Sequence, residues 1–398
     1  MKLTDDMLSW ISRNAGEDTS RLLLRHGSDP ELRFCIMQIG CRRQAARKLP
    51  DTLRNQRFQF PTTLSAEQCT SDALAKFHAS LVNLGETVLD MTAGLGIDAF
   101  HIAATASHVT AIDMNPDVAE ALGHNAEALG VTNLEAVCAD SVEWLKSTGR
   151  TFDTIFIDPA RRGQSGRRLF ALADCTPDVT SLLPLLRQRC RRLIVKASPM
   201  LDVSQTLREL PDTQILYVTG TRHECKELVA VCDFTVTRQS NPTIVALTAD
   251  GDIWSELRFT ASEERVADAS FADPEPDMIL YEPYPAVLKS GAFRILCQLY
   301  GCAKLHASTH LYLSSGAIAG FPGTPYGIEA IIPFNSGEIK RVKDRIPSAS
   351  VATRNFILSA DELRKKLKLK EDSRRRIIGT TSQSGRILIV IHPLCEPN

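Results

Sequence analysis

The spacing of apolar and polar residues changes along the chain, and each kind of spacing predicts a different kind of structure. Over residues 1–60 apolar side chains recur every three or four positions, as in "DDMLSWISRN" and "ELRFCIMQIGCRRQAARKL", and this spacing predicts helices. Thr4 precedes the first of these segments and is a good N-cap. After an extended piece, "SAEQCTSDALAKFHASLV" predicts one more helix, capped near Ser65 with Gln68 three residues on, as in a capping box.

From residue 85 short apolar runs alternate with helical segments. The runs "TVLDMTAG", "HVTAIDMN", "LEAVCAD", "FDTIFIDPAR" and "RRLIVKASP" are typical of strands, and segments between them such as "PDVAEALGHNAEALG" are typical of helices. This alternation predicts an α/β fold, a doubly wound sheet with a largely parallel centre. We expect "TQILYVTGT" and "KELVAVCDF" to form an antiparallel pair that closes one edge of this sheet.

Beyond residue 240 the alternation stops. "TIVALTADGDIWSEL" predicts a hairpin that turns on Asp250-Gly251, and the Pro/Asp-rich "ERVADASFADPEPD" predicts a linker. A single helix is expected over "AVLKSGAFRILCQLYG" and another over "SADELRKKLKLK", with strands at "THLYLSS", "GIEAIIPF" and "RILIVIHPL". The C-terminal part is therefore predicted to be a small α+β region.

The net charge, the lengths of the apolar runs and the cysteine pattern exclude several classes of protein. The net charge of −1 over 398 residues excludes a global attraction to nucleic acid or membrane, so any basic surface must be local. No apolar run reaches the roughly 18 residues of a membrane helix, and the acidic, amphipathic N-terminus is not a signal peptide, so we expect a cytoplasmic protein. The 11 cysteines contain no CxxC pair; we interpret them, Cys138, Cys190 and Cys232 included, as reduced core residues, and expect no metal site.

A glycine-rich loop between two acids, "LDMTAGLGID", allows two interpretations. Gly94 to Ala99 fits G-x-G-x-x-A, the dinucleotide pattern, with Asp113 as the ribose acid. However, Asp90, Asp113, Asp140 and Asp158 end four successive predicted strands, so they should share one edge of the sheet. Four carboxylates suit a cation such as S-adenosylmethionine better than a pyrophosphate. Each acid could instead cap the helix that follows its strand.

The segment "IFIDPARRG" is the catalytic candidate. Asp158-Pro159 resembles the start of the (Asp/Asn)-Pro-Pro-aromatic segment of amino-methylating enzymes, in which oxygens accept hydrogen bonds from the target amine. Ala160-Arg161 departs from that pattern, and the alternative is a strand that simply ends at a proline. The four arginines of "RRGQSGRR" suit phosphates, with a solvated loop as the alternative.

These motifs resemble class I S-adenosylmethionine-dependent methyltransferases over about residues 60–235. The arrangement "EQCTSDALAKFHA…LDMTAGLGID…DPARR", with "YEPYPAVLKSGAFRILCQLYG" and "FPGTPYGIEAI" after it, resembles a bacterial family with C-terminal ferredoxin-like and THUMP-like parts. The resemblance implies a Rossmann-like sheet and four regions: an N-terminal helical region (1–60), a methyltransferase domain (61–270), a ferredoxin-like segment (275–318) and a THUMP-like domain (319–398).

The resemblance also implies an activity and a set of site residues. We expect methylation of a nucleobase in RNA such as rRNA or tRNA, with an exocyclic amine favoured. A stretch from Lys340 to Arg376, with 13 basic and 5 acidic residues, is consistent with an RNA partner. The expected cofactor-binding residues are Asp90, Thr92, Gly94, Gly96, Asp98, Asp113, Met114, Asp140, Ser141 and Asp158. The expected catalytic residues are Asp158, Pro159 and Arg161, and the expected substrate-binding residues are Arg162, Arg167, Arg168, Lys196, Lys365 and Lys366.

Other functions stay open at the level of sequence. The chain could be an RNA-binding protein that keeps an inactive methyltransferase fold, or an NAD-dependent enzyme. It could also methylate a small molecule or a protein, because a fold does not fix a substrate.

Overall fold

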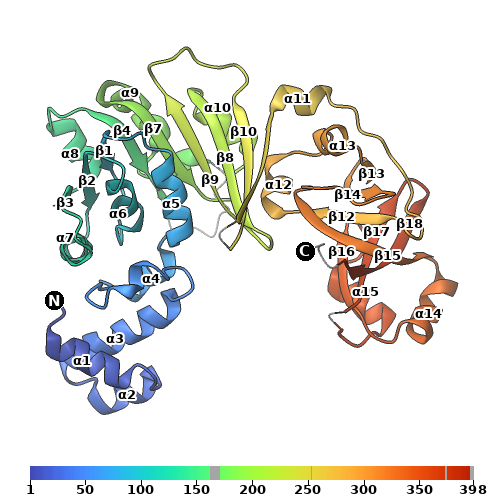
Figure 1. The fold of residues 1–398 in the computed structure, drawn as a ribbon, viewed down its shortest axis with the longest axis horizontal. Coiled ribbons are helices and arrows are strands. Elements are labelled where there is room, and N and C mark those ends of the chain that lie inside the picture. Colours follow the sequence, from blue (N-terminus) through green and yellow to red (C-terminus); the bar gives the residue numbers. More distant parts are fainter. Residues whose placement is uncertain (162–170, 252, 373, 395–398) are drawn as a thin grey trace. The chain divides into compact units, whose positions relative to one another are not determined.

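The computed structural model describes residues 1–161, 171–251, 253–372 and 374–394 (Figure 1). The chain divides into two compact units. The first comprises Met1–Ala197, Gln205–Gln214 and Ala230–Arg238, and the second comprises Ser198–Ser204, Ile215–Val229 and Gln239–Asn398.

The N-terminal part of the first unit is helical, as its spacing predicts. Its elements are α1 (Asp5–Asn14), α2 (Thr19–His26), α3 (Pro30–Ala45), the 3-10 turn η1 (Thr52–Arg54), α4 (Thr63–Gln68) and α5 (Asp72–Ser80). The Thr4 side chain accepts a hydrogen bond from the Met7 amide, so the predicted N-cap is confirmed. The single helix and the capping box predicted near Ser65 are wrong: Thr62 caps α4, accepting from the Ser65 amide at 3.0 Å, and Ser71 caps a separate helix, α5.

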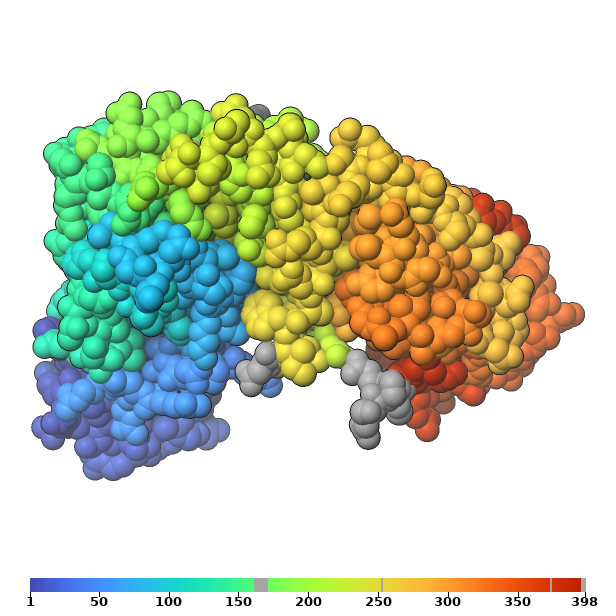
Figure 2. Space-filling view, turned by 45° about the horizontal axis from the view of Figure 1, so that its top comes forward, coloured from blue at the N-terminus to red at the C-terminus, as the bar shows by residue number. Residues whose placement is uncertain are grey.

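The helices of residues 1–60 form a lobe beside the strand–helix part of the same unit (blue and teal in Figure 2). Leu3, Met7, Ile11, Leu22 and Ile36 belong to its core. Hydrogen bonds attach the lobe to the helix that follows the second strand: Asn55 Nδ2 donates to the Ala128 carbonyl at 2.6 Å, and the Gln59 amide donates to Asn125 Oδ1 at 2.8 Å.

The central sheet has the order β11-β10-β8-β9-β7-β4-β1-β2-β3. Its strands are β1 (Thr87–Asp90), β2 (His108–Asp113), β3 (Leu134–Cys138), β4 (Phe152–Ile157), β7 (Cys190–Ala197), β8 (Thr213–Thr221), β9 (Cys225–Asp233), β10 (Thr243–Asp250) and β11 (Ile253–Thr260). The helices between them are α6 (Ile97–Ala103), α7 (Pro116–Leu129), α8 (Ser141–Ser147), α9 (Val179–Arg189) and α10 (Val203–Glu209). Strands β3, β2, β1, β4 and β7 are parallel neighbours, which confirms the α/β prediction.

The prediction that residues 213–234 close one edge of the sheet is wrong. β10 pairs in parallel with β8, and β11 pairs antiparallel with β10, so β11 is the last described strand on that side. The hairpin predicted on Asp250-Gly251 is confirmed, because Asp250 and Ile253 are partners. Ile244, Val245 and Ala246 are all buried, so both faces of β10 are covered; an apolar run of this kind does not reveal which strand it joins.

The second unit contains a mixed sheet in the order β13-β14-β12-β15-β18-β17-β16. Its strands are β12 (Ile279–Pro283), β13 (Ala303–His306), β14 (Thr309–Ser314), β15 (Gly323–Pro333), β16 (Ser350–Arg354), β17 (Arg376–Ser382) and β18 (Gly385–Pro393). Its helices are α11 (Ala261–Val266), α12 (Pro285–Ser290), α13 (Ile295–Tyr300), α14 (Ser336–Arg345) and α15 (Ala360–Leu367). The single helix expected over residues 286–301 is wrong: Gly291 takes φ 85° and ends α12, and α13 begins four residues later.

The described residues can be compared with the predictions about membrane helices and cysteines. No helix in the described ranges combines the length and the hydropathy that a membrane crossing requires. The described cysteines are free thiols, and burial raises the pKa of Cys190 and of Cys232 to about 12. Cys138 is exposed, so its interpretation as a core residue is wrong.

Candidate active site at the carboxyl edge of the sheet

Five of the predicted residues lie at one edge of the sheet because neighbouring strands are parallel. Asp90 and Asp113 are the last residues of β1 and β2, Asp140 and Asp158 follow β3 and β4, and Lys196 stands next to last in β7. In open parallel sheets the ligand crevice lies outside the carboxyl ends of the strands. The strand order therefore brings four acids and one lysine to the edge where a ligand is expected.

The glycine loop between β1 and α6 is fixed by backbone geometry and close packing. Gly94 and Gly96 take φ values of 53° and 86°, in the left-handed region that favours glycine. A Cβ atom on Gly96 would lie 2.3 Å from Leu122 Cδ1 and 2.7 Å from Phe100 Cζ, so a larger residue would have to displace these side chains. The turn also places Thr92, whose hydroxyl accepts a hydrogen bond from the Asp158 amide at 2.7 Å and so ties the loop to the end of β4.

Asp90 is a buried carboxyl group, 1% exposed, that accepts a hydrogen bond from the Thr92 amide at 3.0 Å. Burial raises the pKa of Asp90 to about 8, and the nearby carboxylates of Asp98 and Asp158 add to this shift. Both effects disfavour a negative charge. Asp90 is therefore mainly protonated at neutral pH until a cation approaches it.

Asp98, at the start of α6, is also buried but is held in its ionised form. His78 Nδ1 lies 2.7 Å from its Oδ1, the Thr70 hydroxyl donates to its Oδ2 at 2.6 Å, and Lys196 Nζ is 3.6 Å from the same oxygen. Burial opposes ionisation, but Lys196 and His78 outweigh it and hold the pKa of Asp98 well below its usual range. Asp98 therefore anchors a charged network beside Asp90.

Asp158 faces this network from the end of β4. Lys196 Nζ donates to Asp158 Oδ2 at 2.6 Å and to Thr70 Oγ1 at 2.8 Å. The lysine side chain is 12% exposed, whereas the Asp158 side chain is 41% exposed. Pro159 is buried directly after it. Asp158 thus combines a fixed carboxylate with access to solvent.

The other predicted cofactor residues lie on the β2 and β3 side of the edge. Asp113 Oδ2 accepts from the Gly94 amide at 3.1 Å and Asp113 Oδ1 from the Asn115 amide at 2.8 Å. Asp140 Oδ1 accepts from the amides of Val142 and Glu143, so Asp140 caps α8 as its alternative interpretation requires. Met114 is 72% exposed after β2, and Ser141 is the first residue of α8.

Of the predicted substrate-binding residues, Lys196 lies at this edge, and among the described residues the structure brings no other of them to it. Arg162, Arg167 and Arg168 lie outside the described residues, and Arg161 is described only by its backbone, which pairs with Cys175. Lys365 and Lys366 are exposed on α15, in the second unit.

Sequence reasoning missed Thr70 and His78. Thr70 precedes α5 and His78 lies within it, in the segment "CTSDALAKFHA". The His78 side chain is fully buried, and its ring lies 5.6 Å from that of Phe156 on β4. A histidine on the buried side of a short helix was the available signal, but its partner Asp98 is 20 residues away in sequence.

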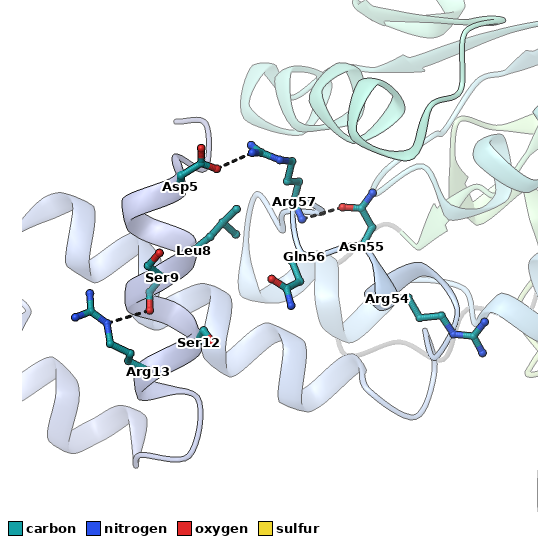
Figure 3. Close-up of a pocket in the computed structure, with 9 residues that line it drawn as sticks. All are labelled: Asp5, Leu8, Ser9, Ser12, Arg13, Arg54, Asn55, Gln56 and Arg57. Atoms are coloured by element: carbon teal, nitrogen blue, oxygen red, sulfur yellow. Dashed lines mark hydrogen bonds and ion pairs between the residues drawn. The ribbon is translucent and has the colours of Figure 1, made fainter.

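A large open hollow elsewhere in the first unit holds none of the predicted site residues. It measures about 830 Å³ and lies between α1 and residues 54–57 (Figure 3). Its Arg57 pairs with Asp5 at 2.6 Å, and both side chains are more than half exposed. Its size reflects a shallow surface between two elements, so it does not compete with the carboxyl edge as an active site.

The carboxyl edge fits S-adenosylmethionine. The buried Asp90 lacks a cation of its own within hydrogen-bond distance among the described residues, which suits an ammonium or sulfonium ligand. The left-handed Gly94 and Gly96 keep side chains out of the loop, so a ligand can approach the backbone. Asp113, next along the edge, offers the acceptor atoms that a ribose diol requires.

Three domain models match successive parts of the chain. A methyltransferase domain matches residues 88–161, a ferredoxin-like domain matches residues 280–322, and a THUMP domain-like region matches residues 323–393. The ferredoxin-like and THUMP-like matches meet inside the mixed sheet, between β14 and β15.

Similar proteins extend this match to the full length. A solved structure from Porphyromonas gingivalis W83, described provisionally as a methyltransferase, is 30% identical with a TM-score of 0.88 and covers 99% of this chain and 100% of its own. An S-adenosylmethionine-dependent methyltransferase of Mycobacterium tuberculosis, described as uncharacterized, is 26% identical over 90% of this chain and 95% of its own. An RNA methyltransferase of Mycoplasma mobile, also described as uncharacterized, is 38% identical, but over 21% of this chain and 23% of its own. The chain therefore belongs to the family of S-adenosylmethionine-dependent methyltransferases that carry ferredoxin-like and THUMP-like domains at the C-terminal end.

Proposed function

We propose that this methyltransferase modifies a nucleobase of RNA, such as rRNA or tRNA, and that an exocyclic amine is the favoured acceptor. The THUMP-like match over residues 323–393 and the RNA methyltransferase of Mycoplasma mobile support an RNA substrate. The excess of basic residues between Lys340 and Arg376 supports it too, since lysine and arginine neutralise phosphates. In this proposal the functional regions are residues 1–60, 61–270, 275–318 and 319–398.

The cofactor-binding roles follow the order of the acids along the edge. When bound, S-adenosylmethionine supplies a methyl group on a sulfonium that is already a good leaving group. Asp90 pairs with the cofactor's ammonium group, directly or through the loop, and Asp113 accepts from its ribose hydroxyls. Asp140 accepts from the adenine amine with the oxygen that does not cap α8.

The observation that carries the acceptor assignment is the position of Asp158. Its carboxylate is held by Lys196 at 2.6 Å and its amide by Thr92 at 2.7 Å, while the side chain stays 41% exposed. Pro159 fixes φ after it and so fixes where the Asp158 carbonyl points. In this proposal the Asp158 carbonyl and the partly exposed carboxylate, both held in fixed directions, orient an amine lone pair toward the methyl group, and such orientation is a large part of catalysis.

Mass spectrometry of nucleosides tests the substrate. RNA from cells that lack this protein should be missing one methylated nucleoside, and the purified protein with S-adenosylmethionine should restore it in that RNA. If the RNA of both strains has the same methylated nucleosides, and the purified protein labels protein or small molecules instead, the RNA proposal is wrong and the methyltransferase assignment stands.

A further inference from the structure

Lys196 is a nearly buried lysine whose ammonium group is already occupied. Its Nζ lies 2.6 Å from Asp158 Oδ2, 2.8 Å from Thr70 Oγ1 and 3.6 Å from Asp98 Oδ2, and the side chain is 12% exposed. Lysines are rarely buried unless they are paired. A group with these contacts is unsuited to reach a phosphate of a substrate, so the sequence-based role of Lys196 as a substrate ligand is not the one its geometry favours.

Thr70 and His78 fix the direction of the Lys196 side chain, Thr70 directly and His78 through Asp98. The Thr70 hydroxyl has one hydrogen, which it donates to Asp98 Oδ2 at 2.6 Å, so its oxygen is left to accept from Lys196. His78 holds the other oxygen of Asp98 at 2.7 Å. Residues from α5, the segment before it, α6 and β7 therefore converge to aim one ammonium group at Asp158.

The charges at this edge explain why a cation is needed there. Asp98 and Asp158 both raise the pKa of the buried Asp90, so Asp90 takes up a proton in preference to them. Asp98 and Asp158 then stay ionised at the same edge, and the Lys196 ammonium group pairs with both. A protonated carboxyl would donate a hydrogen bond where the proposed acceptor role requires it to accept. A buried ion pair adds little net stability, so the cost of burying Lys196 is better explained by what it does to Asp158.

We propose that Lys196 is a positioning residue for methyl transfer, which keeps Asp158 ionised and aimed at the acceptor without touching the substrate itself. This inference rests on the proposed role of Asp158. Thr70 and the His78–Asp98 pair serve the same end by fixing the lysine.

Steady-state kinetics across pH tests the proposal on the full-length protein. The assay measures transfer of a tritiated methyl group from S-adenosylmethionine to total RNA from cells that lack the protein. We expect Lys196→Met to lower kcat on the order of 10-fold or more near pH 6, with KM for RNA almost unchanged. The loss should shrink as pH rises, because without the neighbouring ammonium group Asp158 keeps its proton to a higher pH, and a further rise in pH removes it. Lys196→Arg, which keeps the charge, should retain more activity than Lys196→Met.

Matched variants separate this role from the alternatives. Lys146→Met, at an exposed lysine of α8 paired with Glu143, should leave the pH profile unchanged. Thr70→Val keeps the lysine but removes its hydroxyl support, so it should reproduce the shift of the pH profile to a smaller extent and serves if Lys196→Met does not fold. A rise in KM for RNA at constant kcat would show that Lys196 binds substrate and would overturn the proposal, as would a uniform loss at every pH.

Different experimental results would show that the role of Lys196 is wrong and that the proposed function is wrong. If Asp158→Ala is inactive but Lys196→Met and Thr70→Val keep the wild-type pH profile, only the role of Lys196 is wrong. If Asp158→Ala turns over like the wild type, the acceptor role of Asp158 is wrong and the role of Lys196 falls with it. If the wild type transfers no methyl group to RNA, the RNA proposal fails, and carboxyl NMR titration decides on Lys196: Asp158 must take up its proton at higher pH in Lys196→Met than in the wild type.

Discussion

Asp90 shows at the scale of one residue how a binding site opposes folding. An aspartate in the unfolded chain ionises near pH 4, whereas burial raises the pKa of Asp90 in the folded protein to about 8. Between these values the folded state keeps a proton that the unfolded state has lost. The free energy of unfolding therefore falls as pH rises through this window and is constant above it.

Asp90→Asn should remove that penalty. We expect the variant to be more stable than the wild type at pH 8, by about 1 kcal/mol or more, and the difference to vanish near pH 4. An asparagine oxygen still accepts from the Thr92 amide. Thermal unfolding without cofactor measures this, with Asp140→Asn as a control that should gain nothing because asparagine caps α8 equally well. A variant less stable than the wild type at pH 8 would contradict the pKa shift.

The same substitution should weaken cofactor binding. Losing a hydrogen bond to a charged group costs about 1.5–3 kcal/mol, so calorimetry should show S-adenosylmethionine binding roughly 10- to 100-fold weaker to Asp90→Asn. Equal affinity would mean that the ammonium group lies elsewhere along the edge.

The packing of the glycine loop between β1 and α6 can be tested by the stability of two alanine variants. Gly96→Ala places a Cβ 2.3 Å from Leu122 Cδ1 at a φ of 86°, whereas Gly130→Ala has a similar φ of 72° with nothing within 4 Å. Both should lose about 1 kcal/mol or more from backbone strain, and Gly96→Ala should lose about 1–3 kcal/mol further from the clash. Thermal unfolding of the two variants isolates the packing contribution, and equal losses would contradict the loop geometry described above.

The helices and strands that depend on local sequence could be predicted, but the strands they pair with and the side chains they contact could not. The spacing of apolar residues located α1 and the alternation of β1 to β4, and the acids at the strand ends then had to share an edge. Nothing in the apolar run of β10 showed that it would join β8, and Gly291 resembled a residue inside a helix rather than one at its end. Thr70 and His78 escaped notice because they act on Asp98 and Lys196, which only the folded chain brings to them.

The charge of the whole molecule is unevenly distributed. The chain carries a net charge of −1, but residues 340–376 hold 13 basic and 5 acidic residues. Deleting residues 319–398 is a poor test of this region, because it removes β15 and β18 from the sheet that also contains β12. Substitution of exposed lysines is cleaner.

Replacing Lys365 and Lys366 with glutamine should weaken RNA binding and reduce its dependence on salt. The slope of log K against log salt concentration is negative, and each lost phosphate contact should make it shallower by about 0.7 for single strands. Fluorescence anisotropy with a labelled RNA measures the slope, and Lys146→Gln on α8 serves as the control. An unchanged slope in the double variant would place RNA on another surface.

The most direct measurement compares methyl transfer to RNA by the wild type, Asp158→Asn and Asp158→Ala, with cofactor affinity measured in parallel. If Asp158 orients the acceptor, Asp158→Ala should lower the rate on the order of 10²-fold or more through lost alignment. Asp158→Asn should retain more activity, since an amide oxygen still accepts, and all three proteins should bind S-adenosylmethionine with similar affinity. Turnover of Asp158→Ala near the wild-type rate would show that the acid only ends a strand and does not orient the acceptor.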